Sequence, residues 1–269
     1  MIDNVELENV SFSYHKEAVL QDISTKLVAG TQYALIGSNG SGKSTLAKLI
    51  SGLLTPCTGK IKLAGTSLTN FSTKQLAQNI RYIFQNPDDQ IFNPTVYKEI
   101  TYGYKNFDTE WLREILKLTN LSTYTKRSPY ELSPSERKFV AIASALLAKP
   151  QIIIFDEVTS GLDLAQKQLI EQILKYLNSV NATTIFITHD MEFVYKNFPE
   201  TIILHNKSLI YQGNTISAFT NESLMKKAKL EAPLIVKLFQ AAYANDDIAM
   251  PLDKNDILPA LIRKINQVD

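Results

Sequence analysis

The sequence has few features that would tie it to an oxidising compartment or to a membrane. It contains one cysteine, Cys57, so it cannot form an internal disulfide framework, and a single thiol suits a reducing compartment. No apolar run approaches the roughly 20 residues that a membrane-spanning helix requires. Residues 1–4 lack the basic and apolar pattern of a targeting signal. We therefore expect a cytosolic protein that reaches a membrane only through partners, at its cytoplasmic face.

The sequence also lacks an excess of charge of either sign. Its 28 basic and 27 acidic residues leave a formal net charge of +1. A nearly neutral chain has no long-range field that would attract nucleic acid or an anionic bilayer, so we expect no nucleic-acid partner. Its 269 residues are enough for one large domain with a small appendage.

A glycine-rich segment connects an apolar strand to a helix. Residues 33–36 read as a buried strand, residues 46–50 have the apolar spacing of a helix, and between them lies the pattern G-x-x-x-x-G-K-S of a P-loop. Glycines let the backbone approach a polyphosphate, and the N–H groups of the loop and of the helix N-terminus bind anions. Lys43 should reach the outer phosphates, and Ser44 should offer its hydroxyl to Mg²⁺. The expected nucleotide-binding residues are Gly37, Ser38, Asn39, Gly40, Ser41, Gly42, Lys43, Ser44 and Thr45.

A second apolar run ends in two acidic residues. Residues 152–155 are continuously apolar, which is typical of a parallel strand covered on both faces. Sheets of this kind place ligands at the carboxyl ends of their strands, so Asp156 and Glu157 should lie beside the P-loop. A carboxylate there can hold Mg²⁺, and its neighbour can orient or deprotonate an attacking water. We expect these roles for Asp156 and Glu157, respectively.

Three other polar or aromatic residues lie at the ends of predicted strands. His189 follows the strand of residues 183–187 and should contact the γ-phosphate, and Gln85 follows the strand of residues 81–84. Tyr14 precedes the P-loop and could stack on a purine ring, although a tyrosine at a strand end more often packs against its neighbours.

The middle of the chain, about residues 86–148, has a helical character and is expected to be an insertion into the core. Near its start, Asp88 and Asp89 fit either a solvated turn or a contact to a basic partner segment. Near its end, Ser133 and Glu136 have the spacing of a capping box, with Pro134 at the first helical position.

The last part of the chain carries two further helical patterns, at residues 233–239 and 257–265, separated by the polar residues 245–247. Their apolar faces cannot be buried by so short a segment alone, so they should pack on the core or on another subunit. We expect a domain of residues 1–217 and an extension of residues 218–269.

These motifs, in this order, resemble the nucleotide-binding subunit of an ABC transporter over nearly all of residues 1–217. Residues 84–92 and the helical tail are similar to the ATPases of energy-coupling factor (ECF) transporters, which import vitamins and transition-metal ions. The resemblance implies an α/β fold: a P-loop NTPase core of ABC type with an N-terminal antiparallel β region, a helical insertion and a C-terminal helical dimerisation extension. The site residues that it implies are Tyr14 on adenine, residues 37–44 as the Walker A loop, Gln85 in the Q-loop among the catalytic and Mg²⁺-binding groups, Asp156 as the Walker B aspartate, Glu157 as the catalytic glutamate, and His189 as the switch histidine.

The same resemblance implies ATP and Mg²⁺ as cofactors and three kinds of partner: a second ATPase, a transmembrane coupling protein and a separate membrane protein that binds the substrate. Residues 132–136 match the signature segment and residues 160–163 the D-loop, so Ser133, Ser135 and Asp163 should face the ATP of the second ATPase. Asp88 and Asp89 become plausible contacts for arginines of the coupling protein.

The signature segment departs from the family pattern Leu-Ser-Gly-Gly-Gln. Pro134 supplies no N–H, and Glu136 places a negative charge near the expected γ-phosphate. Like charges about 4 Å apart at an effective dielectric near 20 repel by roughly 4 kcal/mol, unless Glu136 turns away into the capping box. We therefore predict an asymmetric heterodimer in which this chain's own Walker site hydrolyses ATP. The alternative is a nucleotide-binding subunit that hydrolyses ATP weakly or not at all.

Overall fold

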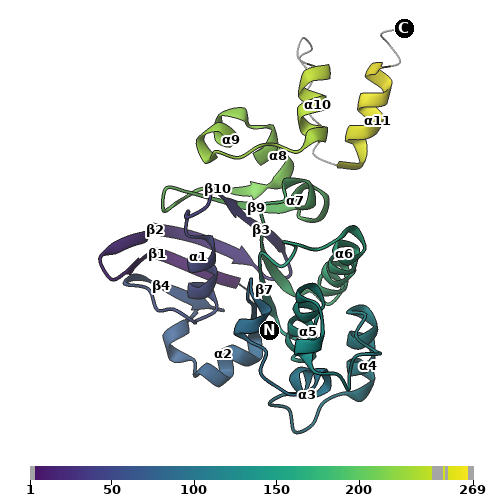
Figure 1. Ribbon diagram of the computed structural model, residues 1–269. Helices are drawn as coiled ribbons and strands as arrows, with labels where there is room; N and C mark the ends of the chain where they lie inside the picture. Colours follow the sequence, from purple (N-terminus) through teal and green to yellow (C-terminus); the bar gives the residue numbers. More distant parts are fainter. Residues whose placement is uncertain (1–3, 244–250, 252–253, 266–269) are drawn as a thin grey trace.

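The computed structural model describes residues 4–243, 251 and 254–265, and it contains two β-sheets flanked by helices (Figure 1). A mixed sheet of six strands has the order β10-β9-β3-β8-β7-β6, and an antiparallel sheet of four strands has the order β2-β1-β4-β5. The strands are β1 (Asn4–Tyr14), β2 (Glu17–Val28), β3 (Gln32–Gly37), β4 (Thr58–Leu63), β5 (Thr66–Ser67), β6 (Ile80–Ile83), β7 (Ile152–Asp156), β8 (Thr183–Ile187), β9 (Glu200–His205) and β10 (Ser208–Asn214). The predicted α/β architecture with an N-terminal antiparallel region is confirmed.

Strands β3, β6, β7, β8 and β9 run parallel, so their carboxyl ends meet at one edge of the six-stranded sheet. The P-loop leaves β3 at this edge, and Asp156 ends β7 two strands away. β10 is the antiparallel partner of β9 and forms a hairpin with it around Asn206 and Lys207. The topology therefore brings the carboxyl ends of these five strands to the same edge.

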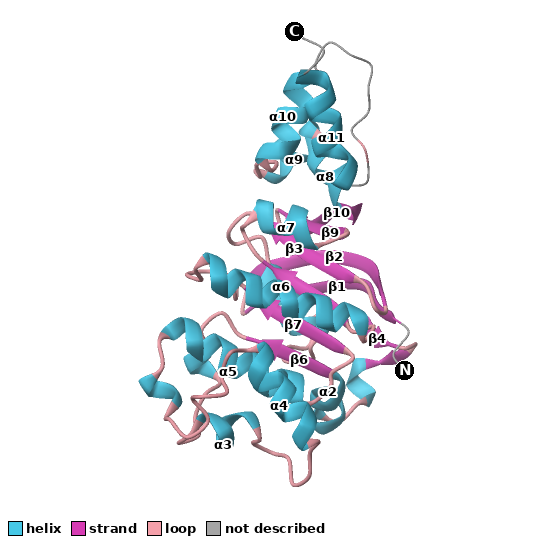
Figure 2. Cartoon of the chain, turned by 90° about the vertical axis from the view of Figure 1, so that its right-hand side faces the viewer, coloured by secondary structure: helices cyan, strands magenta, loops and turns pink. Residues whose placement is uncertain are grey.

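Helices lie on both faces of the six-stranded sheet (Figure 1), and further helices extend beyond it at two ends (Figure 2). The expected insertion contains α3, α4 and α5 and lies at the end of the molecule opposite to α10 and α11. The helices are α1 (Lys43–Ile50), α2 (Thr73–Asn79), α3 (Val96–Ile100), α4 (Thr109–Leu118), α5 (Pro134–Leu147), α6 (Leu164–Ser179), α7 (Met191–Asn197), α8 (Thr215–Thr220), α9 (Glu222–Ala228), α10 (Leu234–Ala242) and α11 (Lys254–Ile265), with short 3-10 helices η1 (Leu68–Asn70), η2 (Pro87–Asp89) and η3 (Pro129–Glu131).

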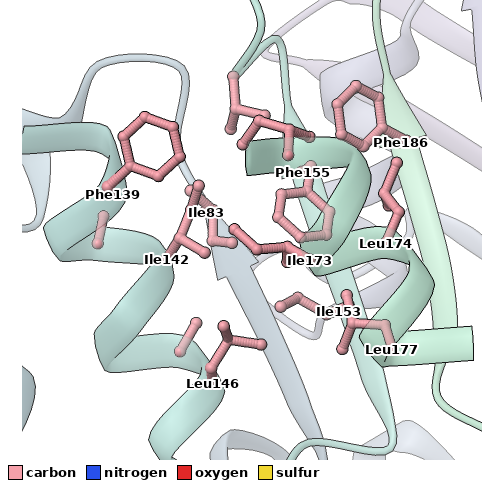
Figure 3. Packing of buried hydrophobic residues seen from close by; sticks show 14 of the residues in the cluster. Ile83, Phe139, Ile142, Leu146, Ile153, Phe155, Ile173, Leu174, Leu177 and Phe186 are labelled. Carbon is pink, nitrogen blue, oxygen red and sulfur yellow. The ribbon is translucent and has the colours of Figure 1, made fainter. Parts of the chain in front are cut away.

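Alternate residues of β7 face two different hydrophobic cores. Ile153 and Phe155 point toward α5 and α6, where they pack with Phe139, Ile142 and Ile173 (Figure 3). The intervening β7 residues belong to a second core, formed with α1 and the antiparallel sheet. Because side chains alternate along a strand, the last residue, Asp156, shares the face of that second core and is directed toward α1.

The C-terminal helices α10 and α11 lie side by side and project from the rest of the molecule (Figure 1). Phe239 of α10 and Ile257 of α11 are buried in a small core with Ile216 of α8. The sequence patterns predicted these two helices but not α8 and α9. Phe219 of α8 and Met225 of α9 pack into the main core, so the expected boundary at residue 217 falls inside α8. The polar residues 245–247 lie outside the described residues.

Among the described residues, no helix combines the length and apolar content needed to cross a bilayer.

Candidate active site

The glycine-rich loop between β3 and α1 has a backbone conformation that leaves N–H groups free to bind an anion. Gly40 and Gly42 have positive φ angles of 76° and 101°, a conformation that L-residues rarely adopt. At Gly37, a Cβ atom would lie 2.3 Å from the carbonyl oxygen of Leu204, so only glycine fits against β9. No side chain caps α1 at Gly42, which leaves the N–H groups of the first helical turn available for an anion.

Two buried polar side chains of the loop fit a bound polyphosphate. Ser41 is 3% exposed, and its Oγ has no hydrogen-bond partner among the residues that the structure describes. The Lys43 ammonium is also buried and donates to the carbonyl oxygens of Gly37, at 2.9 Å, and Ser38, at 3.1 Å. Burial lowers the pKa of Lys43, and the nearby carboxylates of Glu157 and Asp156 partly offset this effect. An anion in the loop would satisfy both side chains.

The carboxylate of Asp156 is held from two sides. Ser44 Oγ donates to its Oδ1 at 3.1 Å, and the Tyr82 hydroxyl donates to its Oδ2 at 2.5 Å. Burial and the Asp156 charge raise the pKa of Tyr82, so the phenol remains protonated and acts as the donor. The motifs predicted that Asp156 lies beside the P-loop and holds Mg²⁺ together with Ser44. They did not predict the direct contact between these two residues or the role of Tyr82, which follows only from the pairing of β6 with β7.

Glu157 lies between two other predicted site residues, Gln85 and His189. Its Oε2 accepts a hydrogen bond from Gln85 Nε2 at 3.2 Å, and its Oε1 lies 3.0 Å from His189 Nε2. Glu157 has a φ angle of 50°, and a left-handed conformation at a residue other than glycine is strained and concentrates at functional sites. The structure therefore brings Gln85, Glu157 and His189 together beside Asp156 and Lys43.

The turn after Glu157 is fixed by contacts that the sequence patterns did not reveal. Lys138 of α5 donates to the carbonyl oxygens of Val158, at 3.2 Å, and Ser160. The buried hydroxyls of Thr159 and Thr188 lie 3.2 Å apart and join the segments that follow β7 and β8. Burial lowers the pKa of Lys138. These contacts tie the acidic turn both to the helix that begins at the signature segment and to the segment that carries His189.

The donor set fits Mg²⁺ only together with a phosphate. Among residues 4–243, 251 and 254–265, no group of three or more His, Cys, Asp and Glu residues could hold a metal ion. Ser44 and Asp156 offer two oxygen atoms, and Mg²⁺ at nucleotide sites is held by one or two protein oxygens, phosphate oxygens and water. Gln85 contacts Glu157 rather than Asp156, so a contact between Gln85 and Mg²⁺ stays a prediction.

Tyr14 lies at the end of β1 and is 44% exposed. Its ring packs edge-on against Phe12, with the centroids 4.9 Å apart. Packing against a neighbour was the expected alternative to stacking on a purine ring. The contact with Phe12 nevertheless leaves much of the Tyr14 ring accessible. Stacking on adenine stays a prediction.

The signature segment forms the expected capping box at the start of α5. Ser133 Oγ accepts from the Glu136 backbone N–H at 3.2 Å, and Glu136 Oε2 accepts from the Ser133 backbone N–H and hydroxyl, each at 2.8 Å. The Ser133 hydroxyl thus donates to Glu136 within this chain. The Ser135 hydroxyl donates to the carbonyl oxygen of Gly161 at 3.4 Å, and Asp163 caps α6 by accepting from Gln166 N. Glu136 has turned into the capping box, although its charge remains at the helix start.

The two acidic residues after the Q-loop are exposed but already have partners within the chain. Asp88 Oδ1 lies 3.1 Å from Arg137 Nη1, and Asp89 Oδ1 accepts from Asn86 Nδ2 at 3.2 Å. Both lie in η2, so the predicted turn is confirmed.

Comparisons with known proteins identify the family to which the chain belongs. The sequence profile of the ABC transporter family matches residues 20–160. The energy-coupling factor transporter ATP-binding protein EcfA1 of Mycoplasma genitalium is 38% identical over 236 residues, which cover 86% of this chain and 86% of the relative. The EcfA1 protein of Mycoplasmoides gallisepticum is 33% identical over 273 aligned positions, covering 98% of each chain.

A solved structure has the same fold. The structure of cbiO1 from Clostridium perfringens, described as part of the ABC transporter complex cbiONQ, aligns with a TM-score of 0.73 and 27% sequence identity. The alignment covers 89% of this chain and 100% of that chain. The chain is therefore an ATPase of the ABC transporter family and is similar to the ATP-binding subunits of energy-coupling factor transporters.

Proposed function

We propose that this chain is the motor subunit of an ECF-type importer for vitamins or transition-metal ions, bound through partner subunits to the cytoplasmic face of the membrane. The observation that carries the proposal is the position of Glu157 between Gln85 and His189, next to Asp156, Ser44 and the buried Lys43. This arrangement can bind a nucleoside triphosphate and act on its terminal phosphate.

The site residues divide the reaction among them. The P-loop N–H groups and Lys43 hold the phosphates, and Ser44 with Asp156 would hold Mg²⁺. When bound, Mg²⁺ neutralises charge on the phosphate oxygens. Glu157 orients the attacking water and accepts its proton, and His189 donates a hydrogen bond to the γ-phosphate. For Glu157 to act on water, its contacts with Gln85 and His189 must loosen, and binding of the triphosphate supplies a competing partner for His189.

An exposed aromatic surface supports docking of the proposed transmembrane partner. Phe92 and Tyr102 are 59% and 60% exposed and contact each other edge-to-face, with their centroids 4.8 Å apart. Asp88 and Asp89 lie just before the loop that carries Phe92. Exposed aromatic rings beside carboxylates fit a partner segment that is apolar and basic. Because Asp88 pairs with Arg137, an arginine of the partner would have to share or displace that contact, whereas the Asp89 carboxylate accepts a hydrogen bond from the neutral amide of Asn86.

The start of α5 supports an asymmetric pair of ATPases. Pro134 has no N–H to offer, and the Ser133 hydroxyl is engaged by Glu136. A second, different ATPase with an unaltered signature segment would complete the Walker site of this chain, and that composite site would hydrolyse ATP. The opposite site, which would use residues 133–136 of this chain, would bind ATP more than turn it over. The extension of residues 218–269 would hold the pair together, and a separate membrane protein would bind the transported substrate.

The substitution Glu157→Gln tests the hydrolytic role in the assembled transporter. It keeps the size of the side chain and its amide can still contact Gln85 and His189, but it removes the base. ATP turnover should therefore fall by about 100-fold or more, while binding of ATP persists. Both are measured on the purified complex, by phosphate release and by equilibrium nucleotide binding.

Glu171→Gln is the matched control, because Glu171 of α6 pairs with Lys196 of α7, and neither residue is among the proposed site residues. Turnover by the Glu171→Gln complex should equal that of the unmodified complex. Undiminished turnover by the Glu157→Gln complex would reject the hydrolytic role and favour the second candidate, a nucleotide-binding subunit that regulates the complex without hydrolysing ATP, for which the altered signature is the supporting observation.

A further inference from the structure

Tyr82 lies on β6, and none of the sequence motifs includes it. Its side chain nevertheless reaches the proposed metal site. Tyr82 is paired in register with Ile154 on the neighbouring parallel strand. Since side chains alternate along both strands, Tyr82, Ile154 and Asp156 share one face of the sheet. The phenol therefore extends along that face toward the strand end, and its hydroxyl reaches Asp156 Oδ2 at 2.5 Å.

The two oxygens of Asp156 are thereby given different partners. Ser44 contacts Oδ1 at 3.1 Å, and Tyr82 contacts Oδ2. The torsion that rotates a carboxylate has a broad energy minimum, so an aspartate without such contacts samples many orientations. Two donors on opposite oxygens restrict this rotation. Oδ1 then remains on the side of Ser44, the residue that the P-loop pattern assigns to Mg²⁺.

The ring and the hydroxyl of Tyr82 have separable roles. The ring packs against the core beneath α1 and against Phe84, with ring centroids 4.8 Å apart. Phenylalanine would keep this packing. The hydroxyl, in contrast, has Asp156 as its hydrogen-bond acceptor, so its removal changes the carboxylate rather than the core.

We propose that Tyr82 is a positioning residue for the metal ion: its hydroxyl fixes the orientation of Asp156 so that the carboxylate is preorganised to bind Mg²⁺ with the nucleotide. The inference rests on the proposed function, because it requires a metal–nucleotide complex at the P-loop. Groups that orient a metal ligand typically contribute 10–100-fold to metal affinity, so the loss of this hydroxyl should have a measurable effect.

The test measures metal binding directly instead of turnover. The 269-residue chain is saturated with a non-hydrolysable ATP analogue, and Mn²⁺ is titrated as the probe, with free Mn²⁺ read by electron paramagnetic resonance. Tyr82→Phe should weaken Mn²⁺ binding by about tenfold or more. Binding of the analogue in excess chelator, where no metal contributes, should be unchanged, since Tyr82 hydrogen-bonds to Asp156 and not to the P-loop.

Tyr211→Phe is the matched control, because the Tyr211 hydroxyl donates to the carbonyl oxygen of Asn214, at 2.9 Å, outside the site. Its Mn²⁺ affinity should remain that of the unmodified chain. Unchanged Mn²⁺ affinity in Tyr82→Phe, with or without a lower melting temperature, assigns Tyr82 to packing and overturns the inference. An equal loss in Tyr211→Phe overturns it as well.

Asp156→Asn separates this inference from the proposed function. If Asp156→Asn weakens Mn²⁺ binding and Tyr82→Phe does not, the metal site stands and only the role of Tyr82 is rejected. If Asp156→Asn also leaves Mn²⁺ binding unchanged, Asp156 does not hold the metal, and both the metal site of the proposed function and the role of Tyr82 fail.

Discussion

At the scale of single residues, Asp190 shows how the fold holds a charge next to the predicted γ-phosphate contact. It directly follows His189 and caps α7, with its Oδ1 accepting from the Phe193 N–H at 3.0 Å. Its Oδ2 lies 2.7 Å from Lys167 Nζ. Burial by itself raises the pKa of Asp190, but the hydrogen bond from Lys167 and those from the backbone outweigh this, so the pKa is lowered overall. The charged form is therefore the one that stabilises the native chain.

This shift predicts a pH-dependent effect of Asp190→Asn. Asparagine still caps the helix but loses the ion pair, so the substitution should lower the free energy of unfolding by about 1 kcal/mol near pH 7. Because the folded pKa lies below the unfolded value, the stabilisation is fully present above the unfolded pKa and is lost as the pH falls through the folded pKa. The free energy of unfolding, measured by urea denaturation, should therefore differ less between Asp190→Asn and the unmodified chain below about pH 4.

Glu222→Gln is the control for this measurement. Glu222 pairs with Lys226 one helical turn away, and both side chains are largely exposed, so the pair should contribute little at any pH. The role of the ion pair would be contradicted if the free energy of unfolding differed between Asp190→Asn and the unmodified chain by the same amount at neutral and at acidic pH.

At the scale of one element, the start of α5 combines a stable helix terminus with an altered signature. Pro134 occupies the first turn, and Glu136 completes the capping box with Ser133. Hydrogen bonds from the Ser133 N–H and hydroxyl lower the pKa of Glu136, so its carboxylate is charged at neutral pH. The same contacts that stabilise the helix therefore keep a negative charge at the surface expected to face the ATP of the second ATPase.

In the assembled complex, the double substitution Pro134→Gly and Glu136→Gln should remove the negative charge and supply the missing N–H at the signature segment. Glycine restores a backbone N–H, and glutamine removes the charge but can still serve as the third residue of a capping box. If the site that uses this segment is the weak one, ATP turnover per complex should rise by about twofold, because a second site begins to contribute. The measurement is steady-state phosphate release by the complex with its natural partner ATPase.

A second version of the complex that also carries Glu157→Gln tells which site has gained activity. The increase should persist in that background, since the proposed function assigns Glu157 to the other composite site. Turnover that is unchanged or lower in the complex carrying only the double substitution would argue against an inhibitory role of the altered signature.

At the scale of the whole molecule, the projecting helices expose an apolar surface at one end. Leu234 and Leu238 of α10 are 63% and 50% exposed, and Leu258 and Ile262 of α11 are 57% and 50% exposed. Within each helix the two residues are four positions apart, so they lie on one side of it. The small core of α10 and α11 leaves these side chains uncovered. This arrangement agrees with the proposal that the extension pairs with that of a second ATPase.

Substitution of Leu234 and Leu238 by glutamate should prevent this pairing. The side chains are already exposed, so the melting temperature of the single chain should change little, while burial of two charges at an interface would be costly. Native mass measurement of the co-purified complex should then find the two ATPases dissociated.

Val180→Glu serves as the comparison, because Val180 is 51% exposed but lies at the end of α6, away from these helices. Its complex should keep the mass of the unmodified assembly. A glutamate-substituted α10 that still yields an intact pair of ATPases would mean that residues 218–269 do not hold the pair together.

Local patterns were sufficient for several parts of the molecule because neighbours in sequence determine them. The P-loop, the strand that ends at Asp156, the capping box of Ser133 and Glu136, and the helices α10 and α11 follow from residue spacing and helix-terminus chemistry. The short helices α8 and α9 were missed. They have 6 and 7 residues, and their asparagine caps at Asn214 and Asn221 are equally compatible with turns.

The tertiary structure alone decided which distant side chains meet. The strand order β3-β8-β7-β6 places Gln85 and His189 on opposite oxygens of Glu157, and the register of β6 with β7 brings the Tyr82 hydroxyl to Asp156. Strand order and register depend on contacts between segments that are many residues apart, and no local periodicity encodes them. The amino-acid sequence by itself therefore determined the kind of chemistry this protein can perform. The packing of the sheet determined how each predicted site residue is held.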